Sequence, residues 1–205
     1  QGGVVRMSKC FAAIVAAALL SVAPAALAQV AKEDLATPPA DADEFVIISA
    51  AGQHGTAARW TDAEGDQWSR ESILLRGLVW EQDQETRFGP DGMPMAVTVR
   101  GVSPSGDSGE TYAIADGTAR WTSQVDEGSA GYDSPAYYLT QGGTWISAAT
   151  LVEALYDAPG KSLELLPSGT ARLEKLTEAA VGEGDVAQTV TAYTIEGLSL
   201  SLIHI

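Results

Sequence analysis

From residue 45 onward, hydrophobic and polar positions alternate in short runs that are separated by turn-forming residues at intervals of about ten positions. A period of two is typical of β-strands that bury one face and expose the other. The pattern predicts strands over residues 45–48, 54–61, 67–76, 78–88, 95–100, 109–115, 118–124, 170–181 and 186–195. Residues 67–88 fit either two strands or one long strand that bends at Gly77.

Turn signals between these runs favour an antiparallel meander. The Gly- and Pro-rich segment from Gly89 to Pro94 predicts a hairpin. Asp116-Gly117 is a dipeptide preferred in two-residue hairpin turns, because both central residues there take a positive φ. Residues 126–134 are rich in glycine and acidic side chains, so we expect a loop.

One segment departs from the β pattern. Between Ser147 and Ala158 the apolar residues follow helical spacing, with Ser147 as the expected N-cap and Pro159-Gly160 as the stop. The apolar face of this helix consists of Ala148, Leu151, Val152 and Leu155. The sequence therefore predicts a mainly β fold of the α+β class: a curved antiparallel β-meander of about nine strands packed around one helix.

Residues 7–28 have the organisation of a signal peptide that precedes this domain. Lys9, with Arg6 ahead of it, supplies a positive start to a mostly apolar run of about a dozen residues. That run is shorter than the ~20 residues needed to span a bilayer, so a permanent anchor is the weaker interpretation. We expect a periplasmic or extracellular protein with no stable membrane insertion after cleavage.

The small residues Ala26 and Ala28 occupy the positions that signal peptidase recognises, which predicts cleavage before Gln29. Residues 29–44 are polar and carry Pro38-Pro39, so we expect a flexible lead-in to a β-rich domain over residues 45–199.

Both ends of the chain differ in character from the domain between them. Residues 1–6 precede a plausible start at Met7 and are interpreted as translated upstream sequence. Residues 200–205 resemble the peptide encoded by a sequencing adapter, and the alternative is an ordinary apolar strand. The adapter interpretation predicts that the natural protein continues with a further domain.

Composition narrows the function classes. The chain has 27 acidic against 12 basic residues, and loss of Arg6 and Lys9 with the signal leaves a formal charge of −17. This charge disfavours binding to nucleic acids and to anionic membrane surfaces. The single cysteine, Cys10, lies within the signal, so the domain has no disulfide, thiolate nucleophile or zinc–cysteine site.

Candidate catalytic and metal-binding motifs are weak. Gly106-Asp107-Ser108-Gly109 resembles the nucleophile motif of trypsin-like proteases, but His54 lies too close in sequence to serve as the base, and a polar turn explains the motif better. His54 has no second histidine or cysteine nearby to complete a metal site. We therefore predict no catalytic residue and no metal ligand in this sequence.

Three acidic clusters remain as possible weak calcium sites, with solvated loops as the favoured interpretation because none matches a known calcium loop. They are Asp41-Ala42-Asp43-Glu44, the group Asp62, Glu64 and Asp66, and Asp126-Glu127.

Aromatic residues on the predicted strands give the remaining candidate site. A curved sheet lined by such rings binds a lipid or an aromatic ligand when a cavity is left between them, and otherwise the rings fill the core. The candidate ligand-binding residues are Trp68, Trp80, Trp121 and Tyr112.

Long antiparallel strands that curl around one helix resemble the half-open barrels of bacterial lipoprotein carriers. More specifically, three segments resemble the β-rich region that precedes the catalytic domain in exported bacterial amidohydrolase-family proteins. These segments are Arg87–Pro94, Asp116–Trp121 and Tyr193–Leu198, and the resemblance covers residues 45–198.

The second resemblance implies a non-catalytic N-terminal β-domain whose partner is a downstream catalytic barrel in the same chain. That barrel would hold zinc or a similar divalent metal through His-x-His and further ligands, none of which matches a position of this sequence. The alternative is a periplasmic carrier that holds an apolar ligand in a Trp-lined half-barrel.

Overall fold

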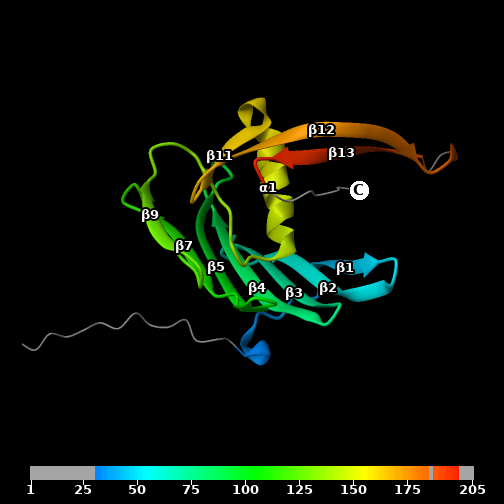
Figure 1. The fold of residues 1–205 in the computed structure, drawn as a ribbon, viewed down its shortest axis with the longest axis horizontal. Helices are drawn as coiled ribbons and strands as arrows, with labels where there is room; N and C mark the ends of the chain where they lie inside the picture. The colour runs from blue at the N-terminus through cyan, green and yellow to red at the C-terminus, as the bar shows by residue number, and fades with distance from the viewer. Residues whose placement is uncertain (1–30, 185–186, 199–205) are drawn as a thin grey trace, which may run out of the picture.

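Most of the chain belongs to two β-sheets with one helix between them (Figure 1). The computed structural model describes residues 31–184 and 187–198. The predicted signal peptide, its cleavage residues Ala26, Ala28 and Gln29, and the tail over residues 200–205 lie outside the described residues.

The larger sheet has nine strands in the order β1-β2-β3-β4-β5-β7-β8-β9, with β6 pairing with β5, and every pairing in it is antiparallel. Its strands are β1 (Asp43–Ser49), β2 (Gly52–Thr61), β3 (Gln67–Leu75), β4 (Leu78–Phe88), β5 (Pro94–Ser103), β6 (Gly106–Asp107), β7 (Glu110–Ala115), β8 (Thr118–Thr122) and β9 (Glu127–Gly131). The predicted antiparallel meander is confirmed for this sheet. Strand β9 lies where we expected a loop, because its small residues pair along the length of β8.

Tight turns set the register of the meander. Residues 67–88 form two strands, because Arg76 and Gly77 both take positive φ, 53° and 80°, and reverse the chain in a two-residue turn. The predicted hairpin at Asp116-Gly117 is confirmed, with φ values of 51° and 68°.

A second sheet was not predicted. It has four strands in the order β10-β11-β12-β13, namely β10 (Tyr137–Tyr138), β11 (Ser162–Leu166), β12 (Thr170–Val181) and β13 (Gln188–Glu196). The expectation of one meander was therefore wrong in this respect. Strand β10 is a two-residue element that pairs in parallel with β11, and so short a pairing leaves no alternating pattern in the sequence.

Helix α1 (Trp145–Asp157) confirms the predicted helix and begins two residues earlier than expected. The N-cap residue is Thr144 instead of Ser147, whose hydroxyl donates to the Thr144 carbonyl oxygen at 2.6 Å within the first turn. Among the residues that the structure describes, no helix is long and apolar enough to cross a membrane.

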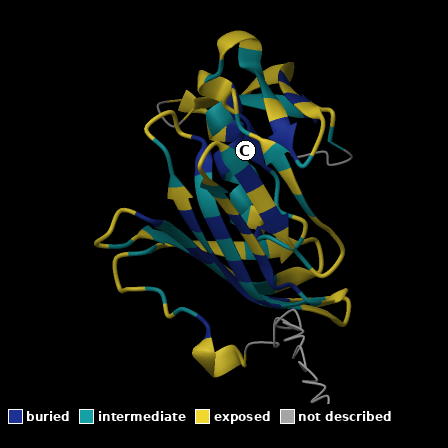
Figure 2. Cartoon of the chain, turned by 90° about the vertical axis from the view of Figure 1, so that its left-hand side faces the viewer, coloured by how far each residue is buried: buried dark blue, intermediate teal, exposed yellow. Residues whose placement is uncertain are grey.

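The apolar face of α1 packs mainly against the second sheet. Leu151 and Leu155 are fully buried in a cluster with Leu165, Leu173 and Ile195 of β11, β12 and β13. Figure 2 colours the chain by burial, with buried segments in dark blue. The expected burial of Leu151, Val152 and Leu155 is confirmed, but the surface that receives them is the unpredicted sheet.

Polar side chains hold the N-terminus of α1 on the larger sheet. We call the face of this sheet that lies toward α1 the inner face. Five buried polar residues on it contact the segment that leads into α1, and we call them the polar seat: Ser69, Glu71, Gln82, Gln84 and Glu110. Glu71 Oε1 accepts the Ile146 amide at 3.3 Å, and Gln84 Oε1 accepts the Thr144 amide at 3.1 Å. The remaining contacts are Ser69 Oγ with Thr144 Oγ1 at 2.7 Å, Gln82 Nε2 to Gly143 O at 3.0 Å, and Glu110 with the Gln141 and Gly142 amides and the Tyr138 hydroxyl.

The expected flexible lead-in is ordered where it is described. Residues 31–42 cross the outer face of the larger sheet, opposite α1 (Figure 1). Leu35 is 6% exposed, the Ala36 amide donates to Asp83 Oδ2 at 2.6 Å, and Lys32 pairs with Glu81 at 3.0 Å. One buried apolar side chain and two polar contacts to distant residues fix the position of this segment. These contacts cannot be predicted from the sequence of the segment alone.

Candidate functional site

The four aromatic candidates do not line one pocket. Tyr112 stacks on Tyr138, with ring centroids 4.0 Å apart, and Trp121 packs beside them. All three rings belong to a buried cluster that fills the space between β5, β7, β8 and the second sheet. Burial raises the pKa of the Tyr112 hydroxyl, which has no hydrogen-bond partner among the described residues. These rings are core.

Trp68 and Trp80 lie on opposite faces of the larger sheet. Trp68 pairs with Glu85 on the outer face, whereas Trp80 pairs with Ile73 on the inner face. Trp68 stacks on Trp60 at 6.0 Å and donates from Nε1 to Asp62 at 2.8 Å. Trp80 instead contacts Trp145 of α1. A carrier pocket lined by all four predicted residues is therefore absent from the described structure.

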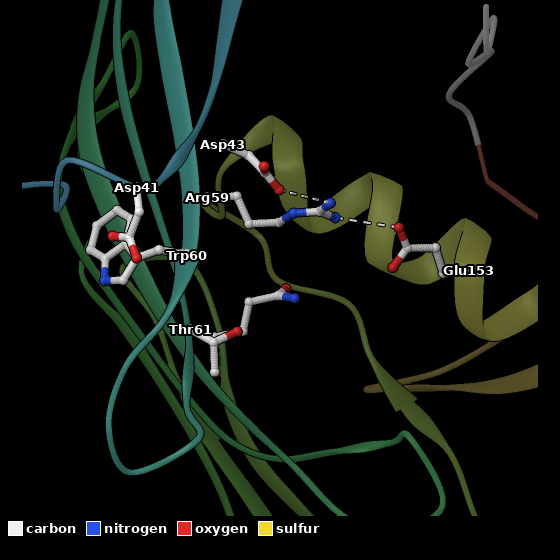
Figure 3. Close-up of a pocket in the computed structure, with 7 residues that line it drawn as sticks. Asp41, Asp43, Arg59, Trp60, Thr61 and Glu153 are labelled. Carbon is white, nitrogen blue, oxygen red and sulfur yellow. Dashed lines mark hydrogen bonds and ion pairs between the residues drawn. The ribbon is translucent and has the colours of Figure 1, made fainter.

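A different recess opens between the β1–β2 edge of the larger sheet and α1 (Figure 3). Its volume is about 380 Å³, and Arg59 crosses it between two carboxylates. Arg59 Nη2 lies 3.6 Å from Asp43 Oδ2, and Arg59 Nη1 lies 3.3 Å from Glu153 Oε1. Three elements thus meet at one guanidinium, which ties the edge of the sheet to the helix.

A second recess, of about 570 Å³, lies between α1 and β13. Its wall combines Val152 and Tyr156 of the helix with Val190 and Tyr193 of the strand. The two tyrosine rings meet edge to face at 6.2 Å. Glu153 lines both recesses, so they adjoin, and we call the pair the inner groove.

The inner groove is polar and acidic at one end and more apolar at the other. Arg59 is the basic residue among those that line it, against Asp41, Asp43, Glu153 and Asp157. The apolar and aromatic side chains gather between α1 and β13. An amphiphilic ligand matches this gradient, with its apolar body along the helix and its polar end beside Arg59.

Among the inner-groove residues, the sequence had pointed to Asp41 and Asp43, as part of an acidic cluster, and had not predicted a ligand site there. Arg59, Glu153 and Tyr193 come from three elements that are distant in sequence, and no motif in the sequence indicates that they meet. The alternating pattern placed their strands and helix, but the second sheet that closes the groove was missing from the prediction.

The acidic clusters were considered as metal sites. Carboxylate oxygens of Asp62, Asp66 and Glu85 lie within 4.8 Å of one another on the outer face. Arg87 binds Asp66 through two nitrogens, at 2.9 and 2.5 Å, and Asp62 accepts Trp68 Nε1, a contact that lowers the Asp62 pKa. The carboxylates of Asp62 and Asp66 already have protein partners, so the cluster has the features of an ion-paired surface and does not by itself define a metal site.

The expected polar turn lies at Pro104-Ser105, just ahead of the Gly106–Gly109 motif, because Gly106 and Asp107 form the short strand β6 and Ser108-Gly109 connect it to β7. Asp107 Oδ1 accepts the Gly109 amide at 2.8 Å, and the Ser108 amide donates to the Gly101 carbonyl. The His54 ring instead contacts Ser49 Oγ at 2.6 Å at the β1–β2 hairpin, with strands β3 to β5 between it and Ser108. The structure does not bring a base to this serine.

No protein-family model, curated protein or solved structure matches this chain. The resemblances to the amidohydrolase β-region and to lipoprotein carriers therefore stay predictions.

Proposed function

We propose that this domain is a non-catalytic binding module that holds a single-chain amphiphile in the inner groove. The observation that carries the proposal is that the two recesses adjoin at Glu153, one walled by Val152, Tyr156 and Tyr193 and the other crossed by Arg59. Each recess has a volume in the range of small-molecule sites, about 300–1,000 Å³.

Charge at the polar end selects the head group. Arg59 attracts an anionic group, but Asp43 and Glu153 flank it at 3.6 and 3.3 Å, and they favour a cationic group beside it. A zwitterionic head group satisfies both, whereas a bare carboxylate meets repulsion from the flanking acids. We therefore expect a lysophospholipid with an ethanolamine head group to bind more tightly than a fatty acid of equal chain length.

Calorimetric titration with lysophosphatidylethanolamine and dodecanoate, each kept below its micelle concentration, tests this proposal. Tyr156 is 55% exposed, so Tyr156→Ala removes part of the apolar wall with little effect on folding. We expect it to weaken lysophosphatidylethanolamine binding about tenfold, which corresponds to ~1.4 kcal/mol. Leu176→Ala, at an exposed position of β12 outside the groove, is the control. Absence of binding, or equal binding by both variants, would contradict the proposal.

A second candidate function is the one implied by the amidohydrolase resemblance, a β-domain that packs on a downstream catalytic domain. Exposed apolar side chains on β1 and at the β3–β4 hairpin favour it, because isolated domains seldom expose such clusters. They are Phe45, Val46, Ile48, Leu74, Leu78 and Val79.

Recovery of the uninterrupted reading frame tests this second candidate. We expect a downstream region with a His-x-His motif, and we expect the domain alone to show no hydrolysis with added zinc or manganese. A stop codon shortly after Leu200, or a continuation without any His-x-His motif, would contradict this second candidate function. Metal-dependent turnover by the domain alone would show that it is itself catalytic.

A further inference from the structure

A second pair of adjoining recesses lies at the end of the larger sheet where β4 begins and β5 ends. One recess, of about 330 Å³, is lined by Trp80 and Trp145, and the other, of about 250 Å³, is lined by Ser108 and Gln124. Both recesses share four residues, so they form a continuous surface that we call the tryptophan recess. The shared residues are Ser103, Ser105, Gln141 and Gly142.

Two indole rings form an angled wall at one side of this recess. The rings of Trp80 and Trp145 are 5.8 Å apart at 73°, in an edge-to-face arrangement. Trp145 is the first residue of α1 and is 46% exposed, although its neighbour in the helix start, Thr144, is almost fully buried. A large aromatic surface is thus left open to solvent beside a recess, which is the geometry of a stacking platform.

Several neutral hydrogen-bonding groups also line the recess. Ser103, Ser105, Ser123 and Gln141 contribute hydroxyls and an amide. Ser108 is 5% exposed, and its hydroxyl has no hydrogen-bond partner among the described residues. A buried hydroxyl without a partner costs free energy unless a ligand or water supplies the missing contact.

The charge of the recess is low. Glu110 also lines it, but its carboxylate accepts the Tyr138 hydroxyl and the amides of Gln141 and Gly142 at 2.7–3.0 Å. Asp107 is the other acidic side chain; its Oδ1 accepts the Gly109 amide at 2.8 Å and its Oδ2 accepts Gln124 Nε2 at 3.4 Å, which leaves further lone pairs for a ligand. The surface therefore has an aromatic platform, several hydroxyl and amide groups and one carboxylate that can accept a further hydrogen bond.

We propose that the tryptophan recess is a binding site for a neutral carbohydrate. A sugar ring presents an apolar C–H face that stacks on an indole and a rim of hydroxyls that both donate and accept, which matches Trp145 on one side and the serine and glutamine side chains on the other. A lipid chain fits less well because it would leave the serine and glutamine side chains shared by the two recesses without hydrogen-bond partners. The carboxylate of Asp107 accepts a sugar hydroxyl without requiring a cationic ligand.

Calorimetric titration with neutral hexasaccharides of α-1,4-linked glucose, β-1,4-linked glucose and β-1,4-linked N-acetylglucosamine tests this site. We expect at least one of the three to bind and to shift the tryptophan fluorescence. Trp145→Ala is expected to weaken that binding about tenfold or more, and Trp145→Phe, which keeps a stacking face, to restore part of it.

Trp60→Ala is the matched control, because Trp60 pairs with Trp68 on the outer face of the sheet and lines neither part of this recess. The fluorescence and stability of the Trp60→Ala protein should change, but its affinity for the hexasaccharide should equal that of the original protein. The proposal is overturned if none of the three hexasaccharides binds at millimolar concentration, or if Trp145→Ala binds as well as Trp60→Ala. Tyr156→Ala changes the inner groove but not the tryptophan recess, so this variant should bind the hexasaccharide as the original protein does. Binding of the hexasaccharide is thereby tested separately from binding in the inner groove.

Discussion

The free energy of unfolding should fall as the pH rises from about 4.5 to about 7, and Glu71→Gln should remove most of that dependence. Glu71 is 0% exposed, and burial raises its pKa from 4.5 to about 7 despite the amide of Ile146, which donates to its Oε1. Among the described residues, neither its Oε2 nor Oε1 of Gln82, the residue directly opposite on β4, has a hydrogen-bond partner. A proton on Glu71 makes its carboxyl a donor beside this unpartnered acceptor, whereas an ionised carboxylate can only accept.

The sign of the effect follows from the direction of the pKa change. Below pH 4.5 the carboxyl is protonated in both the folded and the unfolded chain, so its contribution to stability is fully present. Between 4.5 and about 7 the unfolded chain loses its proton while the folded chain keeps it, and stability declines until the folded group also ionises. A pKa difference of this size corresponds to about 3 kcal/mol, as an order of magnitude.

Glutamine at position 71 supplies a permanent donor toward Gln82 and an acceptor for the helix amide. We therefore expect Glu71→Gln to be more stable than the original protein at pH 8 and similar to it at pH 5, in urea melts followed by fluorescence. Glu174→Gln, on an exposed carboxylate of β12, is the control and should follow the original protein at both values. A Glu71→Gln protein that loses stability equally at pH 5 and pH 8 would mean that Glu71 is ionised in the folded protein throughout.

Leu155→Ala should lower the free energy of unfolding by about 2 to 5 kcal/mol, a large share of the ~5 to 15 kcal/mol that stabilises a domain. Leu155 is 0% exposed and lies in the cluster that joins α1 to the second sheet, so truncation leaves a cavity that neighbouring side chains fill only in part. Equilibrium denaturation in urea measures the loss.

Glu153→Ala is the control on the same helix, because Glu153 points to solvent. Its ion pair with Arg59 is exposed, and such pairs contribute between about 0 and 1 kcal/mol. We expect a change of no more than about 0.5 kcal/mol. Small and equal losses for Leu155→Ala and Glu153→Ala would show that α1 is not a core helix and would remove the basis for the inner groove.

The alternating pattern predicted the strands of the larger sheet because most of their turns carry a local signal. Asp116-Gly117 specifies its hairpin through the positive φ that both residues adopt. The apolar period of α1 placed Leu151 and Leu155 in the core without knowledge of the surface that receives them. Local chemistry was sufficient in both cases.

The polar seat could not be predicted, because β3 and β4 are polar on both faces. In the run from Glu81 to Thr86, Gln82 and Gln84 face the helix while Asp83 faces the outside, and all three are buried. The hydrophobicity of the residues does not distinguish the two faces. Each face is buried by a different segment: the N-terminus of α1 covers the inner face, and residues 31–42 cover the outer face. Both partners lie far away in the sequence.

The inner groove depends on the same kind of long-range contact. Arg59 and Glu153 are 94 residues apart, and Tyr193 comes from a strand whose sheet begins with the two-residue β10. The prediction of an aromatic ligand site was wrong for a related reason. An aromatic ring on a strand can belong to the core, like Tyr112, or to the outer face, like Trp68, and the sequence does not distinguish the two. Which face is covered is decided by the segments that pack there.

Amide chemical shifts of ¹⁵N-labelled protein, recorded during titration with lysophosphatidylethanolamine, test the proposed binding function most directly. The account predicts that the largest changes fall on Arg59, on residues 152–157 and on residues 188–193, which together line the inner groove. Saturation of these changes below the micelle concentration would establish a specific site. Shifts confined to other surfaces, or no shifts at all, would contradict the claim that the groove between α1 and β13 holds a ligand.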